Sequence, residues 1–414
     1  MTVPGPSSIR PKLHSFSPRG KAMRASIFAL VALAIDVTHS TAVRAETFNV
    51  PCDLSELQDV IQAVNTNGQE DFVWLAPSCF YSLLFATWDV AADGGNPVWI
   101  FGRGTTIRGN HARRVFNVST GATLHLNGVT VADGIATTGN GGGILNGGTL
   151  TLTDSTVTAN GAPEGYGGGI DNTGTLRVTR STVSGNTAAL VGGGIDNAAG
   201  GRLTLTESTV SGNSSLYGGG IRNRASAALF NSTLFGNGGF EGGGLLNEPS
   251  ATATVGNVTF SGNETSGSDG GGGIRNEGAL ELDNTIIAGT RQSGHDCFNN
   301  GTIAPSGGNL VEDGSCSIPG ALSGDPMLFG LAGGRPAYIP LLPGSAAIDA
   351  GSNSSCPGVD QRGFPRPHDG ARDGTTVCDL GAYESACGLL GIELFLVLPI
   401  ARGLARARRS WASA

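Results

Sequence analysis

The sequence predicts an all-β fold, a right-handed parallel β-helix (solenoid) with a short N-terminal capping helix and a loop-rich C-terminal module. Three observations support this fold class. Glycine contributes 68 of the 414 residues, whereas charged and aromatic residues contribute only 14% and 6%. A GGGIxN element recurs along the chain, and a repeat of this size is typical of solenoids. Between its copies, polar and apolar residues alternate with the period of two that defines strands.

Composition and charge exclude several classes of protein. The glycines follow no strict Gly-X-Y period, which excludes collagen, and recurrent Val, Ile, Leu and Thr runs argue against disorder. The formal net charge of −8 argues against nucleic acid as a partner. The only lysines, Lys12 and Lys21, lie in the leader. The mature protein therefore lacks the lysine that Schiff-base and P-loop chemistry require.

The N-terminus resembles a secretory signal peptide over residues 1–45. Arg24 begins a basic segment, residues 25–35 are apolar, and small residues precede a cleavage point after Ala45, the expected processing residue. The preceding stretch is polar and Pro-rich, so Met23 is an alternative start. A buried N-terminal helix is the other interpretation of the apolar segment.

Residues 46–97 are predicted to cap the first coil. Asp53 and Glu56 have the spacing of a capping box, and the following apolar residues share one helical face, which predicts a helix over 54–66. Such a helix would cover the exposed end of the core and blunt a sheet edge that could otherwise aggregate. The first strand is expected to begin at Phe72.

Residues 98–310 are predicted to form the coils. The GGGI element begins at Gly141, Gly167, Gly192, Gly218, Gly242 and Gly271, so its copies are 26, 25, 26, 24 and 29 residues apart. No segment between them has a helical period, which excludes the leucine-rich, ankyrin and tetratricopeptide solenoids. Roughly eight coils stacked about 4.8 Å apart are expected.

Two columns of asparagine recur at fixed places in the repeat. The first contains Asn146, Asn172, Asn197, Asn223, Asn247 and Asn276, and the second contains Asn160, Asn186, Asn213, Asn237 and Asn263. Stacked side-chain amides can hydrogen-bond along such a column, so we interpret them as structural ladders. A row of ligand-binding amides is the alternative.

The variable position of GGGIxN supplies the best catalytic candidates. Ile and Asn are expected to share one direction and the residue between them the other, which places Asp171, Asp196 and Arg222 side by side on successive coils. Paired carboxylates beside an arginine could bind calcium or carry acid–base chemistry. The favoured alternative is a solvated charge ladder in which Asp196 pairs with Arg222, because the column varies between apolar, acidic and basic residues.

Other titratable residues give weaker signals. The histidines His111, His125, His295 and His368 keep no metal or triad spacing. The C-terminal aspartates Asp349, Asp360, Asp369, Asp373 and Asp379 could hold a structural calcium, although Gly- and Pro-rich turns explain them better. No metal site and no cofactor other than this possible calcium is expected.

The seven cysteines indicate an oxidising compartment. Six lie in near pairs along the chain, which makes three disulfides possible: Cys52 with Cys79, Cys297 with Cys316, and Cys356 with Cys378. This pairing rests on proximity along the chain alone. Cys387 is left over, as a processing or attachment residue or as a free thiol.

Several C-terminal motifs support a family resemblance. They are Asp325-Pro326-Met327-Leu328, the segment LLPGSAAIDAG at 341–351, the segment DQRGFPRP at 360–367 and the segment CDLGAYE at 378–384. Together they look like the choice-of-anchor Q domain, over residues 311–386. The repeats at roughly 140–290 resemble those of the polymorphic outer-membrane adhesins of bacteria. These resemblances imply display at a bacterial surface and no assigned catalytic residue.

Residues 387–414 resemble a C-terminal sorting tag. An apolar segment, 388–401, is followed by Arg402, Arg406, Arg408 and Arg409. Fourteen helical residues rise only about 21 Å, short of a hydrocarbon core of about 30 Å. The segment is therefore expected to be held by sorting machinery at the inner membrane and then cut, or to remain as a weak anchor and the only membrane contact.

These features lead to one functional expectation and one alternative. The leading expectation is an exported, monomeric, non-enzymatic β-helix at the bacterial cell surface or outside the cell, which binds or adheres to an extracellular glycan or another surface ligand. The alternative is an extracellular polysaccharide lyase or glycoside hydrolase of the pectate-lyase-like β-helix type.

Overall fold

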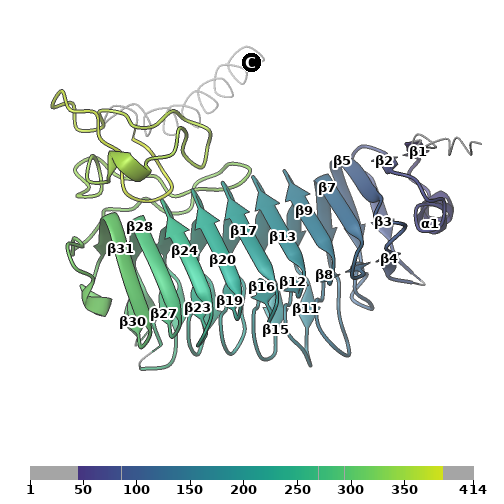
Figure 1. Ribbon diagram of the computed structural model, residues 1–414, viewed down its shortest axis with the longest axis horizontal. Coiled ribbons are helices and arrows are strands. Elements are labelled where there is room, and N and C mark those ends of the chain that lie inside the picture. The colour runs from purple at the N-terminus through teal and green to yellow at the C-terminus, as the bar shows by residue number, and fades with distance from the viewer. Residues whose placement is uncertain (1–44, 85, 269, 293, 386–414) are drawn as a thin grey trace, which may run out of the picture. The chain divides into compact units, whose positions relative to one another are not determined.

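The computed structural model describes residues 45–84, 86–268, 270–292 and 294–385. The strands of this part stack in parallel as a β-helix of about 10 turns (Figure 1), which confirms the predicted fold class. The predicted signal peptide before Ala45, Cys387 and the sorting tag lie outside the described residues. No helix among the described residues is long and apolar enough to cross a membrane.

Three sheets run along the coils. The largest contains β1 (Glu46–Val50), β2 (Asp71–Leu75), β3 (Phe80–Ser82), β5 (Pro97–Arg108), β7 (Thr123–Ala132), β9 (Thr149–Thr153), β10 (Thr156–Thr158), β13 (Thr175–Thr179), β14 (Thr182–Ser184), β17 (Arg202–Thr206), β18 (Thr209–Ser211), β20 (Ser226–Phe230), β21 (Thr233–Phe235), β24 (Thr252–Gly256), β25 (Thr259–Ser261), β28 (Ala279–Ala288) and β31 (Thr302–Val311). The second contains β4 (Trp88–Val90), β6 (Phe116–Val118), β8 (Ile144–Asn146), β12 (Ile170–Asn172), β16 (Ile195–Asn197), β19 (Ile221–Asn223), β23 (Leu245–Asn247), β27 (Ile274–Asn276) and β30 (Cys297–Asn299). The third is interrupted: β11 (Gly161–Ala162) pairs with β15 (Thr187–Ala188), and β22 (Gly238–Gly239) with β26 (Glu264–Thr265) and β29 (Arg291–Gln292).

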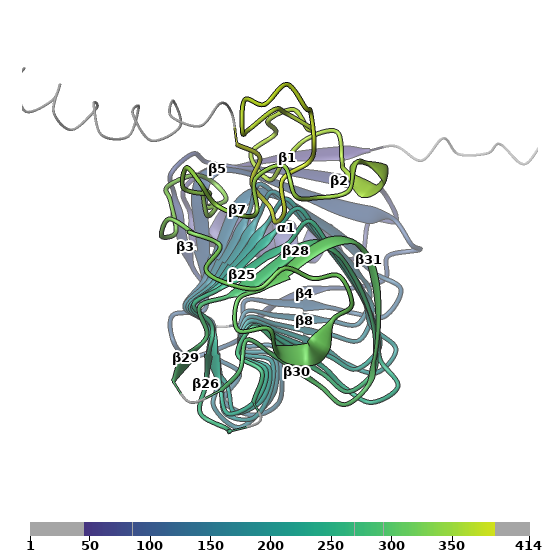
Figure 2. The same cartoon turned by 90° about the vertical axis from the view of Figure 1, so that its left-hand side faces the viewer.

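One repeat shows how the sequence builds a coil. Strand β8 carries the Ile and Asn of the GGGIxN element, and β9 follows after a two-glycine turn. Asp154 then takes a left-handed conformation, with φ of 49°, and turns the chain into β10. Ile144 stacks on Ile170, which stacks on Ile195, because the coils pair in parallel and in register. Figure 2 shows the coils superimposed on one another. The buried residues inside them form one continuous apolar cluster.

The N-terminal cap differs from its prediction in two respects. A strand, β1, precedes the helix and pairs with β2, so the expectation that strands begin at Phe72 is wrong. Helix α1 (Leu54–Ala63) is shorter than the predicted 54–66. It ends earlier because the Asn65 side chain turns to the flank of β4, donating to Asp89 O at 2.6 Å and accepting from Ala91 N at 2.8 Å. With these earlier coils the solenoid has about 10 turns instead of eight.

The segment after β31 runs back along the solenoid instead of continuing it (Figures 1 and 2). It contains two short 3₁₀ turns, η1 (Ser315–Ser317) and η2 (Asn353–Ser355), and isolated antiparallel bridges. A small apolar cluster joins it to β28 and β31. Polar contacts extend the junction over earlier coils: Gln361 accepts from the Thr233 hydroxyl at 2.6 Å and donates to Thr209 Oγ1 at 2.9 Å.

Candidate functional site

The first asparagine column forms a continuous amide ladder. Each Nδ2 donates to Oδ1 of the next coil at 2.6 to 2.8 Å, and the ladder continues one step beyond Asn276, to Asn299. In the second column, from Asn186 onward, each Oδ1 accepts from both the backbone N and the Nδ2 of the asparagine on the preceding coil, as between Asn160 and Asn186. All six asparagines of the first column, from Asn146 to Asn276, are fully buried. These amides hold the coils together and are not exposed to a ligand.

A third ladder was missed in the sequence. A recurrent serine is buried at the corner between two strands, at Ser155, Ser181, Ser208 and Ser232. The Oγ of each of the last three accepts from the backbone N of the preceding serine, and the Oγ of Ser155 accepts from Val129 N. The recurrent Ser in the Ser-Thr-Val element was its signal. Like the asparagines, these serines satisfy backbone donors at a bend.

The predicted neighbours Asp171, Asp196 and Arg222 do lie side by side on β12, β16 and β19. Asp196 pairs with Arg222 at 3.6 Å and with Arg224 at 3.9 Å. The expectation of a solvated charge ladder is wrong for the two aspartates, whose exposed fractions are 2% and 0%. The first glycine of each triplet folds over them: a Cβ on Gly192 would lie 2.7 Å from Asp196 Cβ.

Burial controls the protonation of this pair. Loss of solvent, followed by the negative charge of Asp196, raises the pKa of Asp171 to about 7. Burial also raises the pKa of Asp196, while Arg222 and Arg224 oppose the shift. Asp171 is therefore partly protonated at near-neutral pH. Because neither carboxyl reaches solvent, the pair is poorly placed to exchange protons with a polysaccharide.

Stability should depend on pH through Asp171. A pKa raised on folding contributes stability that is fully present below the unfolded value, near 3.8, and is lost as the pH rises through about 7. Asn cannot ionise, so the Asp171→Asn variant does not lose stability in this way. As the pH rises from about 5 to about 8, we expect its free energy of unfolding to increase by about 1–3 kcal/mol relative to that of wild type. Urea unfolding at both pH values measures this gain. The control Asp154→Asn, which removes a surface pair with Arg180, should have the same effect at both. A pH-independent effect of Asp171→Asn would contradict the assignment.

A cleft of about 400 Å³ opens beside the aspartates. Three variable columns of the repeat line it: the residue before the glycine triplet, the residue between Ile and Asn, and the residue after Asn. Its lining consists of Tyr166, Leu190, Val191, Tyr217, Arg222, Arg224, Glu241, Leu246, Glu248 and Glu277. Asp171 and Asp196 are not among these residues. Only the middle column was predicted to carry function, although the other two are aligned by the same repeat.

Charges of both signs alternate around the cleft. Arg222 pairs with Glu248, Nε to Oε1, at 2.9 Å, and its guanidinium carbon lies 5.9 Å from the ring centre of Tyr166. On the next coils Arg275 lies 3.3 Å from Glu241 and 2.5 Å from Glu277. The tyrosines are half-buried and come from alternate coils, because Tyr166, Val191 and Tyr217 are successive bridge partners. The cleft thus offers phenol rings, carboxylates and guanidinium groups within a few coils.

The three predicted disulfides are confirmed: Cys52–Cys79, Cys297–Cys316 and Cys356–Cys378. The C-terminal aspartates serve turns, where Asp349, Asp360, Asp369, Asp373 and Asp379 each accept backbone N–H bonds. No group of three or more potential metal-binding side chains occurs in the described part of the chain.

Comparison with known proteins gives no relative: no family model, no curated protein and no solved structure matches the chain.

Proposed function

We propose that the chain is an exported, surface-displayed β-helix that binds an extracellular glycan without cleaving it. The cleft between Tyr166 and Glu277 is the observation that carries this proposal. Sugars present hydroxyl groups and flat C–H faces, and sites that combine aromatic rings with a few convergent polar groups suit both. Here the glutamates can accept hydroxyl protons, the arginines can donate to hydroxyl oxygens, and the tyrosines can do both.

Display at a bacterial surface completes the proposal. The three disulfides are compatible with an oxidising compartment. The predicted signal peptide and sorting tag, together with the resemblance of the C-terminal motifs to choice-of-anchor Q domains and of the repeats to polymorphic outer-membrane adhesins, support export and sorting at the inner membrane. Processing at Ala45 and at Cys387 belongs to the same proposal.

A polysaccharide lyase or glycoside hydrolase is the second candidate. It is favoured by one observation, the pKa of Asp171 near 7, which suits a general acid. The burial of both carboxyl groups argues against it.

One experiment separates the two candidates. The full chain is incubated with acidic and neutral polysaccharides, with and without calcium, and both retention on the polymer and release of reducing or unsaturated ends are measured. We expect retention without release. Release that disappears in Asp171→Ala or Asp196→Ala would overturn the binding proposal in favour of the enzyme.

A further inference from the structure

The outer face of the first coils carries an unusual aromatic stack. Trp74 on β2 and Phe101 on β5 are register partners, with ring centres 4.2 Å apart and planes inclined by 15°. In the next row Trp99 stacks on His125 with a centre distance of 3.7 Å. Trp74 is 39% exposed, although large apolar side chains are usually buried.

The Trp74 stack ends abruptly toward the N-terminus. Phe101 covers one face of the indole, and the register partner on the other side, on β1, is Asn49. A cleft of about 450 Å³ lies there, lined by Asn49, Val50, Pro51, Trp74, Leu75, Ala76, Pro77, Phe101 and Arg103. The cleft therefore has room for a flat ring that continues the stack.

The walls of this cleft are fixed. The Tyr81 hydroxyl lies 3.0 Å from Val50 O and 2.7 Å from Pro51 O, and accepts from Ala76 N at 3.2 Å. The Cys52–Cys79 disulfide ties the ends of the same two segments together. A ligand would thus meet a preorganised site, which lowers the entropic cost of binding.

A bulge places a cation at the rim. The register of β5 against β7 shifts between Phe101 and Thr105, and the exposed Arg103 projects from this irregular stretch. Bulges often re-aim a side chain at a binding site. Among the described residues, the Arg103 guanidinium has no ion-pair or hydrogen-bond partner, unlike Arg222 and Arg275.

We infer that this cleft binds an acidic sugar, a pyranose ring bearing a carboxylate, as one unit of a polyuronate chain. The flat C–H face of the ring stacks on the free face of Trp74, and the carboxylate pairs with Arg103. Asn49 can hydrogen-bond the ring hydroxyls. The inference rests on the proposed function in one respect, that the protein binds glycans. The site itself is separate from the cleft lined by Tyr166, Tyr217 and Glu277, which we call the Tyr217 cleft.

The test is a calorimetric titration of the full chain with hexagalacturonate and with the neutral hexamer of galactose in the same linkage. We expect wild type to bind the acidic hexamer at least about tenfold more tightly. Arg103→Gln should remove that preference and leave the affinity for the neutral hexamer unchanged. Trp74→Ala should weaken both by at least about tenfold, and Trp74→Phe should retain most of the affinity.

Two control variants make the result specific. Arg202→Gln removes an exposed arginine from β17 and should change neither affinity. Tyr217→Ala removes a wall of the other cleft and should leave hexagalacturonate binding intact, so the two sites can fail independently. The inference would be overturned if wild type did not bind hexagalacturonate, or if Arg103→Gln or Trp74→Ala bound it with full affinity. It would also be overturned if Tyr217→Ala were the only variant that lost hexagalacturonate binding.

Discussion

Replacing Gly168 by alanine is expected to lower the free energy of unfolding by at least about 3 kcal/mol, because the added methyl group has no space between the coils. A Cβ at this position would lie 2.2 Å from Thr187 O and 2.6 Å from Gly193 O, both backbone atoms of the next coil. Gly168 also donates its N–H to Gly192 O at 3.0 Å, so the coils cannot separate locally without losing a ladder bond. The triplet therefore sets how closely two coils approach.

The matched control is Gly238→Ala. This glycine lies in β22, a small strand of the third sheet, and a Cβ added to it would have nothing within 4 Å. We expect a change of less than about 1 kcal/mol there, within the ordinary propensity difference between the two residues. Urea unfolding followed by circular dichroism measures both variants. Equal destabilisation of Gly168→Ala and Gly238→Ala would contradict the close-packed coil geometry.

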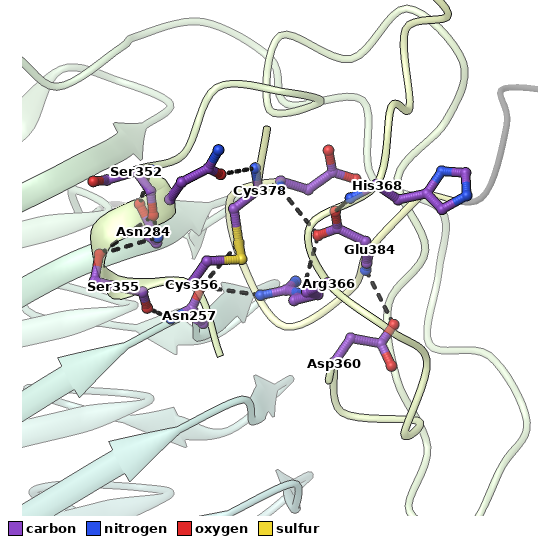
Figure 3. The surroundings of a disulfide bond; sticks show 12 residues. Asn257, Asn284, Ser352, Ser355, Cys356, Asp360, Arg366, His368, Cys378 and Glu384 are labelled. Carbon is purple, nitrogen blue, oxygen red and sulfur yellow. Dashed lines mark hydrogen bonds and ion pairs between the residues drawn. A yellow bond between two sulfur atoms is a disulfide. The ribbon is translucent and has the colours of Figure 1, made fainter. Parts of the chain in front are cut away.

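The second large effect is expected for Arg366→Met, which should lower the free energy of unfolding by about 3–5 kcal/mol. Figure 3 shows Arg366 between the solenoid and the C-terminal segment, beside the Cys356–Cys378 disulfide. It donates to Asn257 Oδ1 at 2.9 Å and pairs with Glu384 at 3.0 Å, and both charged side chains are fully buried. Burial, followed by the charge of Asp379, raises the pKa of Glu384 to about 7, and Arg366 is the cation that opposes this shift, together with backbone N–H bonds from Asp379 and His368. Without Arg366 a buried carboxyl loses its counter-charge.

A double variant separates loss of charge balance from loss of packing. Arg366→Met with Glu384→Gln leaves no unpaired charge, so we expect it to recover at least about 1 kcal/mol relative to Arg366→Met alone. Denaturant unfolding at constant pH, with the exposed Arg202→Met as a control, measures the difference. If the double variant is no more stable than Arg366→Met, the ion pair is not what joins the C-terminal segment to the coils.

The repeat made much of this architecture predictable. In a parallel, in-register solenoid, residues one repeat apart become neighbours, so an alignment of the sequence with itself is also a contact map. That rule predicted the two asparagine columns that begin at Asn146 and Asn160. It also predicted that Asp171, Asp196 and Arg222 are neighbours. The serine corner obeyed it as well, but its recurrent Ser was not interpreted as a ladder.

Features outside the repeat were less predictable. Strand β1 has no GGGIxN signature, and the Asn65 contacts that end α1 are tertiary. The burial of Asp171 depends on a loop from the same coil folding over it, which alternation along a strand does not encode. The cleft requires three columns to converge, and the Arg366 contact joins positions 109 residues apart.

The ladders build the frame of the molecule, and we propose that the variable columns around Tyr217 bind a glycan. The most direct measurement is a titration of the full chain with neutral hexasaccharides, cellohexaose, xylohexaose and maltohexaose, in wild type, Tyr217→Ala and Leu216→Ala. Leu216 is 42% exposed beside the cleft but does not line it. We predict binding of at least one hexamer that falls at least about tenfold in Tyr217→Ala and is unchanged in Leu216→Ala. Binding that both variants retain, or no binding of any hexamer, would contradict this proposal.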